Sequence, residues 1–224
     1  MRQFEQLVRE HLIPEFCSDP NRNCEPVGFR ENLAKLSERD AADFLRAWNG
    51  GLIEHQGRGQ YRAAASSCNE QFFWDGLKNV RPRPFTLWLE PVITIAGLAR
   101  LHFDYGWPKE LIGTQSIDWA FDLVTFLPGE DTEFIAGEVK KSAKEIDTLL
   151  DLMKKFGLDP GLAEPTRSKE RNAFKKVAGL RSREAPIFWA LGPDGLSHVF
   201  QVRYRQSGIL EFEPAFGAQL NYPA

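Results

Sequence analysis

The stretch AGEVKKS, residues 136–142, decides how this chain of 224 residues is interpreted. It places an acid, Glu138, and a lysine, Lys140, two positions apart in a segment with the composition of a β-strand. Because side chains alternate across a strand, these two are expected on the same face. A second strand-like segment, FDLV at 121–124, carries another acid, Asp122. The pattern predicts two carboxylates and a lysine on one face of a sheet.

A hairpin is predicted to join the two segments. The intervening residues LPGEDT, 127–132, contain Pro-Gly and Asp-Thr steps that are typical of a turn. Folding about Glu130 pairs Asp122 with Glu138, which places their β-carbons roughly 4.5–5.5 Å apart. Lys140 then lies one diagonal step from Asp122. The same register pairs Val124 with Ala136 and Phe126 with Phe134.

The predicted side chains match the chemistry of a metal site that cleaves phosphodiesters. Mg²⁺ prefers oxygen ligands in a near-octahedral shell and retains several waters, so one or two carboxylates are enough. Such an ion polarises the scissile phosphate and lowers the pKa of an attacking water. A nearby lysine stabilises the charge that develops, or helps to position and deprotonate the water. We therefore expect Asp122 and Glu138 to bind Mg²⁺ or Mn²⁺, with Lys140 acting beside them.

The alternative is a surface hairpin with ordinary solvated charges, which an E-x-K triplet alone favours. The flanking residues shift the balance, because Phe134, Ile135 and Val139 are apolar and indicate a buried sheet. Unpaired acids are costly in such a sheet and usually have partners. The residues expected to form an apolar opposite face are Ile117, Trp119, Phe121 and Leu123.

A second aspartate shares the predicted face, because Asp118 lies four residues before Asp122. In the register above, Asp118 faces Ser142 and not Glu138. Successive pairs are about 3.3 Å apart along a strand, so Asp118 would lie roughly 13 Å from the Asp122–Glu138 pair. This distance is too long for a shared ion with ligands at about 2.1 Å. The metal ligand is therefore predicted to be Asp122.

With these residues identified, the sequence resembles the PD-(D/E)xK, or restriction-endonuclease-like, nuclease superfamily. Asp122, followed after a hairpin by Glu138-Val139-Lys140, is similar to the family motif, although Phe121 stands where a proline is expected. The resemblance covers roughly residues 85–204 and includes an apolar helical stretch opened by Glu90.

The resemblance implies an α/β fold with an αβββα core, in which a mixed central sheet is flanked by helices. It also implies hydrolysis of DNA, or less often RNA, with Mg²⁺ or Mn²⁺. In that family an acid on the first core helix often joins the site, and Glu90 is the matching position. The alternative is a non-catalytic nucleic-acid-binding or scaffolding protein that kept the fold. The presence of Asp122, Glu138 and Lys140 argues against it, because a structural role does not require all three on one face.

Basic residues are concentrated near the predicted site. Residues 138–183 hold 12 Lys or Arg and 7 Asp or Glu, giving +5, although the whole chain has a net charge of −3. Within 166–183, an apolar stripe of Ala173, Phe174, Val177 and Ala178 predicts a helix. A solvated helix surface and a phosphate-binding face are equal alternatives here. The residues expected to face outward and bind nucleic acid are Lys169, Arg171, Lys175 and Lys176.

The rest of the chain is divided into two regions. Residues 85–224 are predicted to form the nuclease-like domain, with a helix at 141–156 and strands at 186–191, 197–204 and 209–212. Residues 1–84 are predicted to form a helical accessory region, with helices at 2–12 and 38–48 and a hairpin at 52–62. This order also suits a winged-helix DNA reader, although an irregular helical extension is favoured. The predicted boundary is RPRP at 81–84.

Composition limits the other function classes. The chain contains no run of 18 apolar residues, so no membrane-spanning helix is expected. The N-terminus lacks the apolar stretch of a signal peptide. Three cysteines without C-x-x-C spacing indicate reduced thiols and a cytoplasmic location. A zinc site of Cys17, Cys24 and His11 is a minor alternative. Signatures of serine hydrolases, zinc proteases and P-loop proteins are absent. A homodimer is left open.

Overall fold

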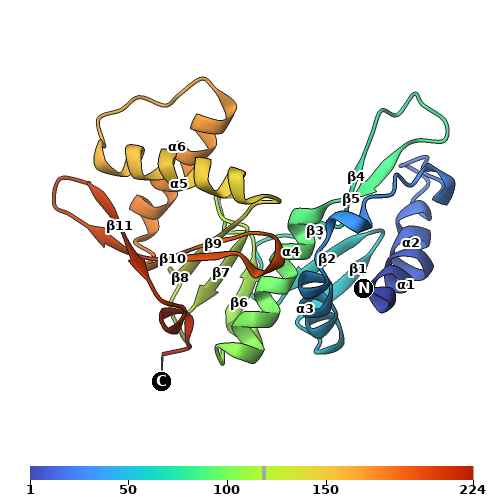
Figure 1. Ribbon diagram of the computed structural model, residues 1–224, viewed down its shortest axis with the longest axis horizontal. Helices are drawn as coiled ribbons and strands as arrows, with labels where there is room; N and C mark the ends of the chain where they lie inside the picture. Colours follow the sequence, from blue (N-terminus) through green and yellow to red (C-terminus); the bar gives the residue numbers. More distant parts are fainter. Residues whose placement is uncertain (118–119, 224) are drawn as a thin grey trace.

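A six-stranded mixed sheet forms the centre of the computed structural model, which describes residues 1–117 and 120–223 (Figure 1). The strand order is β11-β10-β9-β8-β7-β6. Strands β8 and β9 are parallel, whereas the other neighbouring pairs are antiparallel. The predicted α/β class with a mixed sheet is therefore confirmed. The strands are β6 (Ile112–Thr114), β7 (Leu123–Phe126), β8 (Glu133–Val139), β9 (Ile187–Leu191), β10 (Ser197–Tyr204) and β11 (Leu210–Ala215).

The predicted hairpin is present between β7 and β8, and most of its register is confirmed. Val124 pairs with Ala136, as expected. The prediction for Phe126 is wrong, because a register shift after Thr125 pairs Phe126 with Glu133 and not with Phe134. This irregularity lies next to the turn, so it does not alter the register at the other end of the hairpin.

Strand β7 begins later than predicted. Ile117 does not belong to the expected apolar face, because it is 73% exposed and β7 starts at Leu123, whereas Phe121 and Leu123 are buried as predicted. A turn precedes the strand, in which the Ser116 hydroxyl accepts hydrogen bonds from the backbone N–H groups of Ala120 and Phe121. Asp122 therefore lies at the entrance of the strand. Trp119 and Asp118 are outside the described residues.

Helices cover both faces of the sheet and create two separate cores. Ile135 and Trp189 belong to a core that includes α4, whereas Ala136 and Phe188 belong to a core with α5 and α6. Figure 1 shows α5 and α6 together on one side of the sheet. Because side chains alternate along β8, Glu138 shares the second face with Ala136. The helices are α4 (Leu89–Ala99), which continues as the π-helical η4 (Arg100–Asp104), α5 (Ala143–Leu158) and α6 (Ser168–Arg183).

Local sequence signals explain where α5 and α6 begin and end. The Ser142 hydroxyl accepts a hydrogen bond from the Glu145 N–H and so caps the first turn of α5. Helix α6 ends where Glu184 adopts a left-handed conformation, with φ of 56°. Short 3₁₀ turns complete this part of the chain, namely η5 (Lys109–Leu111), η6 (Pro193–Gly195) and η7 (Gly217–Leu220).

Residues 1–87 contain several helices, including the two predicted for 2–12 and 38–48, and two small sheets. The first helical segment continues through a π-helical stretch to Cys17, beyond the predicted end, and includes Pro14. The Ser37 side chain accepts a hydrogen bond from the Asp40 N–H and caps α3. The elements are α1 (Arg2–Leu7), η1 (Val8–Leu12), α2 (Ile13–Cys17), η2 (Pro26–Gly28), η3 (Leu33–Lys35), α3 (Glu38–Asn49), β1 (Ile53–Gly57), β2 (Gln60–Ala63), β3 (Glu70–Gln71), β4 (Phe73–Asp75) and β5 (Phe85–Leu87).

The N-terminal residues share a core with the central sheet. Phe4 and Phe44 belong to the same buried cluster as Ile135 and Trp189. The residues RPRP, 81–84, lie in the connection between β4 and β5, which pair with each other. The division proposed at residue 84 therefore falls inside a hairpin. The predicted hairpin at 52–62 is formed by β1 and β2, while the winged-helix alternative stays a prediction.

Candidate active site

Asp122 is fixed against the end of β8 by its backbone and its side chain. Its N–H donates to the Gly137 carbonyl at 2.9 Å, which continues the hairpin register beyond β7. Its Oδ2 accepts a hydrogen bond from the Val139 N–H, also at 2.9 Å. These two bonds place Asp122 beside Glu138, as the sequence predicted. The two carboxylates therefore lie next to each other at the end of the hairpin.

Glu138 is buried and holds two ammonium groups. Its side chain is 1% exposed, with Lys140 Nζ at 2.5 Å from Oε1 and Lys176 Nζ at 2.5 Å from Oε2. Burial raises the pKa of Glu138, as does the negative charge of Asp122, while Lys176 and Lys140 lower it. The net direction is upward. A buried carboxylate beside a second acid requires positive charge nearby, and here two lysines supply it.

The prediction for the direction of the Lys176 side chain is wrong. It was expected to face outward, but it is 5% exposed and reaches Glu138 from α6. Its Nζ also lies 5.7 Å from the centre of the Phe121 ring. Ala178, expected in the apolar stripe, is exposed instead. The face of α6 that packs on the sheet therefore differs from the predicted one. It brings the ammonium group of Lys176 to the site.

Lys140 remains protonated at neutral pH. Burial lowers its pKa, but Glu138, Asp122 and Glu90 together raise it more, so the net shift is upward. The ammonium group also donates to the Val139 carbonyl at 2.8 Å. A protonated lysine can stabilise negative charge that develops nearby.

Glu90 joins the same electrostatic environment from α4. It lies in the first turn of that helix, where Oε2 accepts a hydrogen bond from Trp88 Nε1 at 3.1 Å. Burial raises its pKa; Lys140 lowers it and Asp122 raises it. Glu90 and Lys140 also line one pocket. The structure thus brings the four predicted site residues, Glu90, Asp122, Glu138 and Lys140, to one place.

A further acid, Glu70, was missed. It comes from β3 in the N-terminal region, and its Oε1 is buried with no hydrogen-bond partner among the described residues. Burial raises the pKa of Glu70 to about 7; the charge of Asp122 adds to the increase, while hydrogen bonds involving Gln115 and Gln71 oppose it. No motif in the sequence signals this residue, because β3 is two residues long and distant from the hairpin.

The raised pKa of Glu70 makes stability depend on pH. Between pH 4.5 and about 7 the folded chain holds a proton that the unfolded chain has released, so stability falls as pH rises through this interval. Glu70→Gln mimics the protonated side chain. At pH 8 we expect the variant to unfold with a free energy about 1 kcal/mol higher than that of the original chain, after allowing for partial exposure.

Urea unfolding at pH 8 and pH 4 measures this difference, which should vanish at the lower pH. Glu54→Gln is the matched control, because Glu54 is exposed on β1. A lower stability of Glu70→Gln at pH 8 would show instead that the ionised carboxylate has a stabilising partner.

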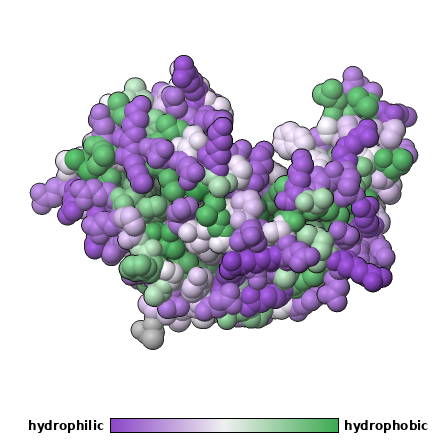
Figure 2. Space-filling view, in the orientation of Figure 1, coloured by the Kyte–Doolittle hydropathy of each residue, from purple (hydrophilic) through white to green (hydrophobic). Residues whose placement is uncertain are grey.

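An open pocket connects the site to the exposed basic side chains. It extends from Glu90 and Lys140 to Lys144 of α5 and Lys169 of α6. Figure 2 shows a hollow on this face of the molecule, between the part formed by α5 and α6 and the part formed by the β4–β5 hairpin. Lys169, Arg171 and Lys175 are exposed, as predicted. They are therefore available to a ligand, unlike Lys176.

No preformed metal cluster accompanies these residues. Within 1–117 and 120–223, no group of three or more His, Cys, Asp or Glu side chains is arranged to hold an ion. The minor zinc alternative of Cys17, Cys24 and His11 thus has no support in this part of the chain. Any cation between Asp122 and Glu138 would depend on two carboxylates and water. The prediction that Asp118 is not a metal ligand concerns a residue outside the described part of the chain.

Comparison with known proteins adds no family. No family model matches the chain, and neither a curated protein nor a solved structure is significantly similar to it. In the part of the chain that the structure describes, the helices are too short or too polar to cross a bilayer. The cytoplasmic location and a homodimer stay predictions.

Proposed function

We propose that this protein is a cation-dependent nuclease that hydrolyses phosphodiester bonds, with DNA as the expected substrate. The observation that carries the proposal is the buried Glu138 beside Asp122, with two lysines on its oxygens, one of which, Lys140, lines an open pocket. The order α4, β6, β7, β8, α5 supports a restriction-endonuclease-like αβββα core, since the three strands are consecutive and antiparallel.

The donor set is suited to Mg²⁺ or Mn²⁺. Asp122 and Glu138 supply the hard oxygen ligands that these ions prefer. Asp122 uses one oxygen for the Val139 N–H, while both oxygens of Glu138 are held by ammonium groups. A cation can replace one ammonium as the charge partner of Glu138, because both relieve the same repulsion. When bound, the ion would polarise the phosphate and lower the pKa of a bound water.

The residues of the chain have separate roles in this proposal. Asp122 and Glu138 hold the ion. The permanently charged Lys140 stabilises the negative charge that develops on the phosphate, and a Lys176 released from Glu138 does the same from α6. Glu90, between Trp88 and Lys140, would orient a water by accepting a hydrogen bond from it. The exposed Lys169, Arg171 and Lys175 bind the nucleic-acid backbone.

A non-catalytic nucleic-acid-binding protein is the second candidate. It is favoured by one observation: Glu138 is already neutralised by Lys140 and Lys176 without a cation. In such a protein Glu138, Lys140 and Lys176 would form a buried ion-pair network, and the exposed basic residues would bind nucleic acid without cleaving it.

Calorimetry with Mn²⁺ separates the two candidates. The original chain is expected to bind the ion, and Asp122→Asn is expected to lose at least about tenfold in affinity because one charged ligand is gone. Glu130→Gln, in the exposed hairpin loop, is the control and should bind normally. If neither the original chain nor the control binds Mn²⁺, the ion-pair network is structural and the nuclease proposal is wrong.

A further inference from the structure

Two exposed tryptophans lie beside the candidate active site. Trp74 of β4 is 63% exposed and Trp88, at the start of α4, is 37% exposed. Their rings are 6.1 Å apart and nearly perpendicular, at 74°. Large aromatic side chains are normally covered, and a pair left in solvent indicates a surface that receives a ligand.

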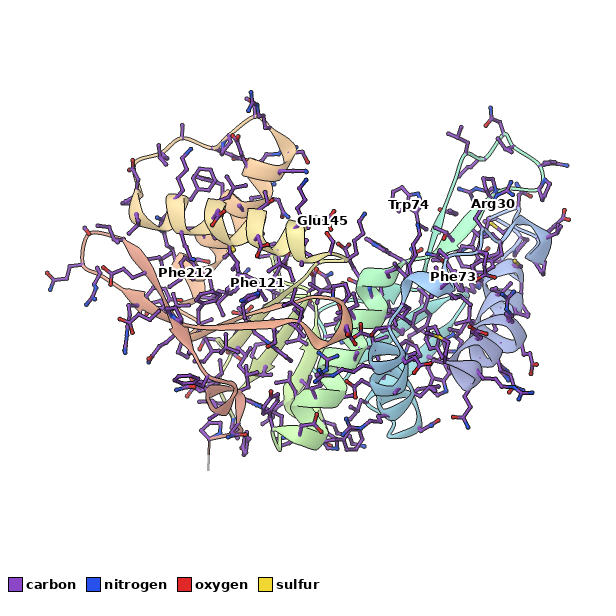
Figure 3. All side chains as sticks on the ribbon, in the orientation of Figure 1. Arg30, Phe73, Trp74, Phe121, Glu145 and Phe212 are labelled. Carbon is purple, nitrogen blue, oxygen red and sulfur yellow. The ribbon has the colours of Figure 1, made fainter. Side chains whose placement is uncertain are left out.

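Trp88 connects this pair to the chemistry. Its Nε1 donates to Glu90 Oε2 at 3.1 Å, and Glu90 interacts electrostatically with Lys140 and Asp122. A group that lies against the tryptophans is therefore next to the pocket that Glu90 and Lys140 line. Figure 3 shows Trp74 on the side of the β4–β5 hairpin that faces Glu145 of α5, across the hollow.

The charge around the tryptophans suits a polyanion. The loop between β4 and β5, residues 76–84, carries Lys78 and Arg81 and no acid, while its third cation, Arg83, is buried and paired with Asp75. Lys78 and Arg81 are exposed, as is Arg30, whose N–H donates to Phe85 of β5. On the other side of the pocket are Lys144 and Lys169. Positive charge with interleaved aromatic rings is the arrangement that binds the backbone and bases of a single strand.

We propose that Trp74 and Trp88 form a stacking platform for unpaired bases, so that the strand to be cleaved enters the site single-stranded. This inference rests on the proposed nuclease function, whose substrate class it names. The faces of bases inside a duplex are already stacked on one another, so only a single strand, an overhang or a frayed end offers them to an aromatic ring. The nearby lysines and arginines hold the phosphates on either side.

Binding measured without cleavage tests the platform. The full chain, kept in EDTA, is titrated into a fluorescent oligothymidylate and into a blunt duplex, and anisotropy is recorded at several salt concentrations. Trp74→Ala is expected to weaken binding of the oligothymidylate about tenfold while leaving the blunt duplex nearly unchanged. Its salt dependence should not change, because no phosphate contact is lost. Trp74→Phe, which keeps a ring, should recover most of the affinity.

Two further variants serve as controls. Lys175→Glu should weaken binding of both ligands and flatten the salt dependence by about one unit of slope, because a phosphate contact is removed. Phe216→Ala, which removes an exposed ring at 82% exposure in the C-terminal segment, should have no effect.

The platform is refuted if Trp74→Ala binds the oligothymidylate like the original chain, if both ligands weaken equally, or if the original chain does not bind the oligothymidylate. It is also refuted if Trp74→Ala only converts a dimer into a monomer in sedimentation, since the pair would then be a self-association surface. Selective loss of single-strand binding without any cleavage by the Mg²⁺-loaded chain would leave the platform standing and reject the nuclease proposal.

Discussion

Glu138→Gln is expected to abolish cation-dependent cleavage of DNA, with a loss of at least about 100-fold in rate. The substitution keeps the shape of the side chain but removes its charge, so it weakens the hold on the cation and the effect of that cation on phosphate and water. Release of acid-soluble fragments from single-stranded and plasmid DNA, with Mg²⁺ or Mn²⁺, measures the loss.

The hairpin supplies a matched control for this experiment. Glu130→Gln makes the same chemical change in the exposed loop between β7 and β8 and should cleave at the original rate. Lys140→Ala should lose activity as well, because the ammonium group beside the carboxylates is removed. Cleavage by Glu138→Gln at the original rate would reject the assignment of this site.

Glu138→Ala is expected to lower the free energy of unfolding by about 3 kcal/mol. Without the two lysine pairs, the same substitution would be expected to raise it slightly. Removing Glu138 relieves its repulsion with Asp122, but it leaves the ammonium groups of Lys140 and Lys176 without their nearest counter-charge. Breaking a buried ion pair from one side costs about 3–5 kcal/mol, because an uncompensated charge stays buried. Urea unfolding followed by circular dichroism measures the change.

A compensating substitution identifies the cause of this loss. Lys176→Met in the Glu138→Ala background replaces the more buried cation with an apolar side chain, so it should recover a substantial part of the stability. If Glu138→Ala unfolds at the same or a higher urea concentration than the original chain, repulsion between Asp122 and Glu138 outweighs the lysine pairs.

The hairpin could be predicted from the sequence because its information is local. The turn residues between 127 and 132 and the alternation of side chains were sufficient to place Asp122 beside Glu138. Local patterns also located the strand at 197–204. The start of β7 was missed, because the turn depends on hydrogen bonds to the Ser116 hydroxyl that strand-like composition does not show.

The charges that complete the site could not be predicted, because they depend on tertiary contacts. In the sequence, Lys176 resembles the other polar residues of a basic helix. Only the packing of α6 on the sheet brings it into contact with Glu138. Glu70 has no motif at all, and its raised pKa results from burial and from an aspartate 52 positions later in the chain. Helical periodicity identifies apolar faces well, but it does not show which long charged side chain reaches inward.

The site combines charged residues from the N-terminal region, the hairpin and α6, so these groups are synthesised at different times. Glu70 is made early, the two acids of the hairpin follow, and Lys176 comes only with α6. A growing chain therefore exposes Asp122 and Glu138 before it has the helix that brings the second counter-charge to Glu138. Glu138 therefore gains its second counter-charge only after α6 has been synthesised and packed on the sheet, so the assembly of this site depends on a helix that follows the hairpin in the chain.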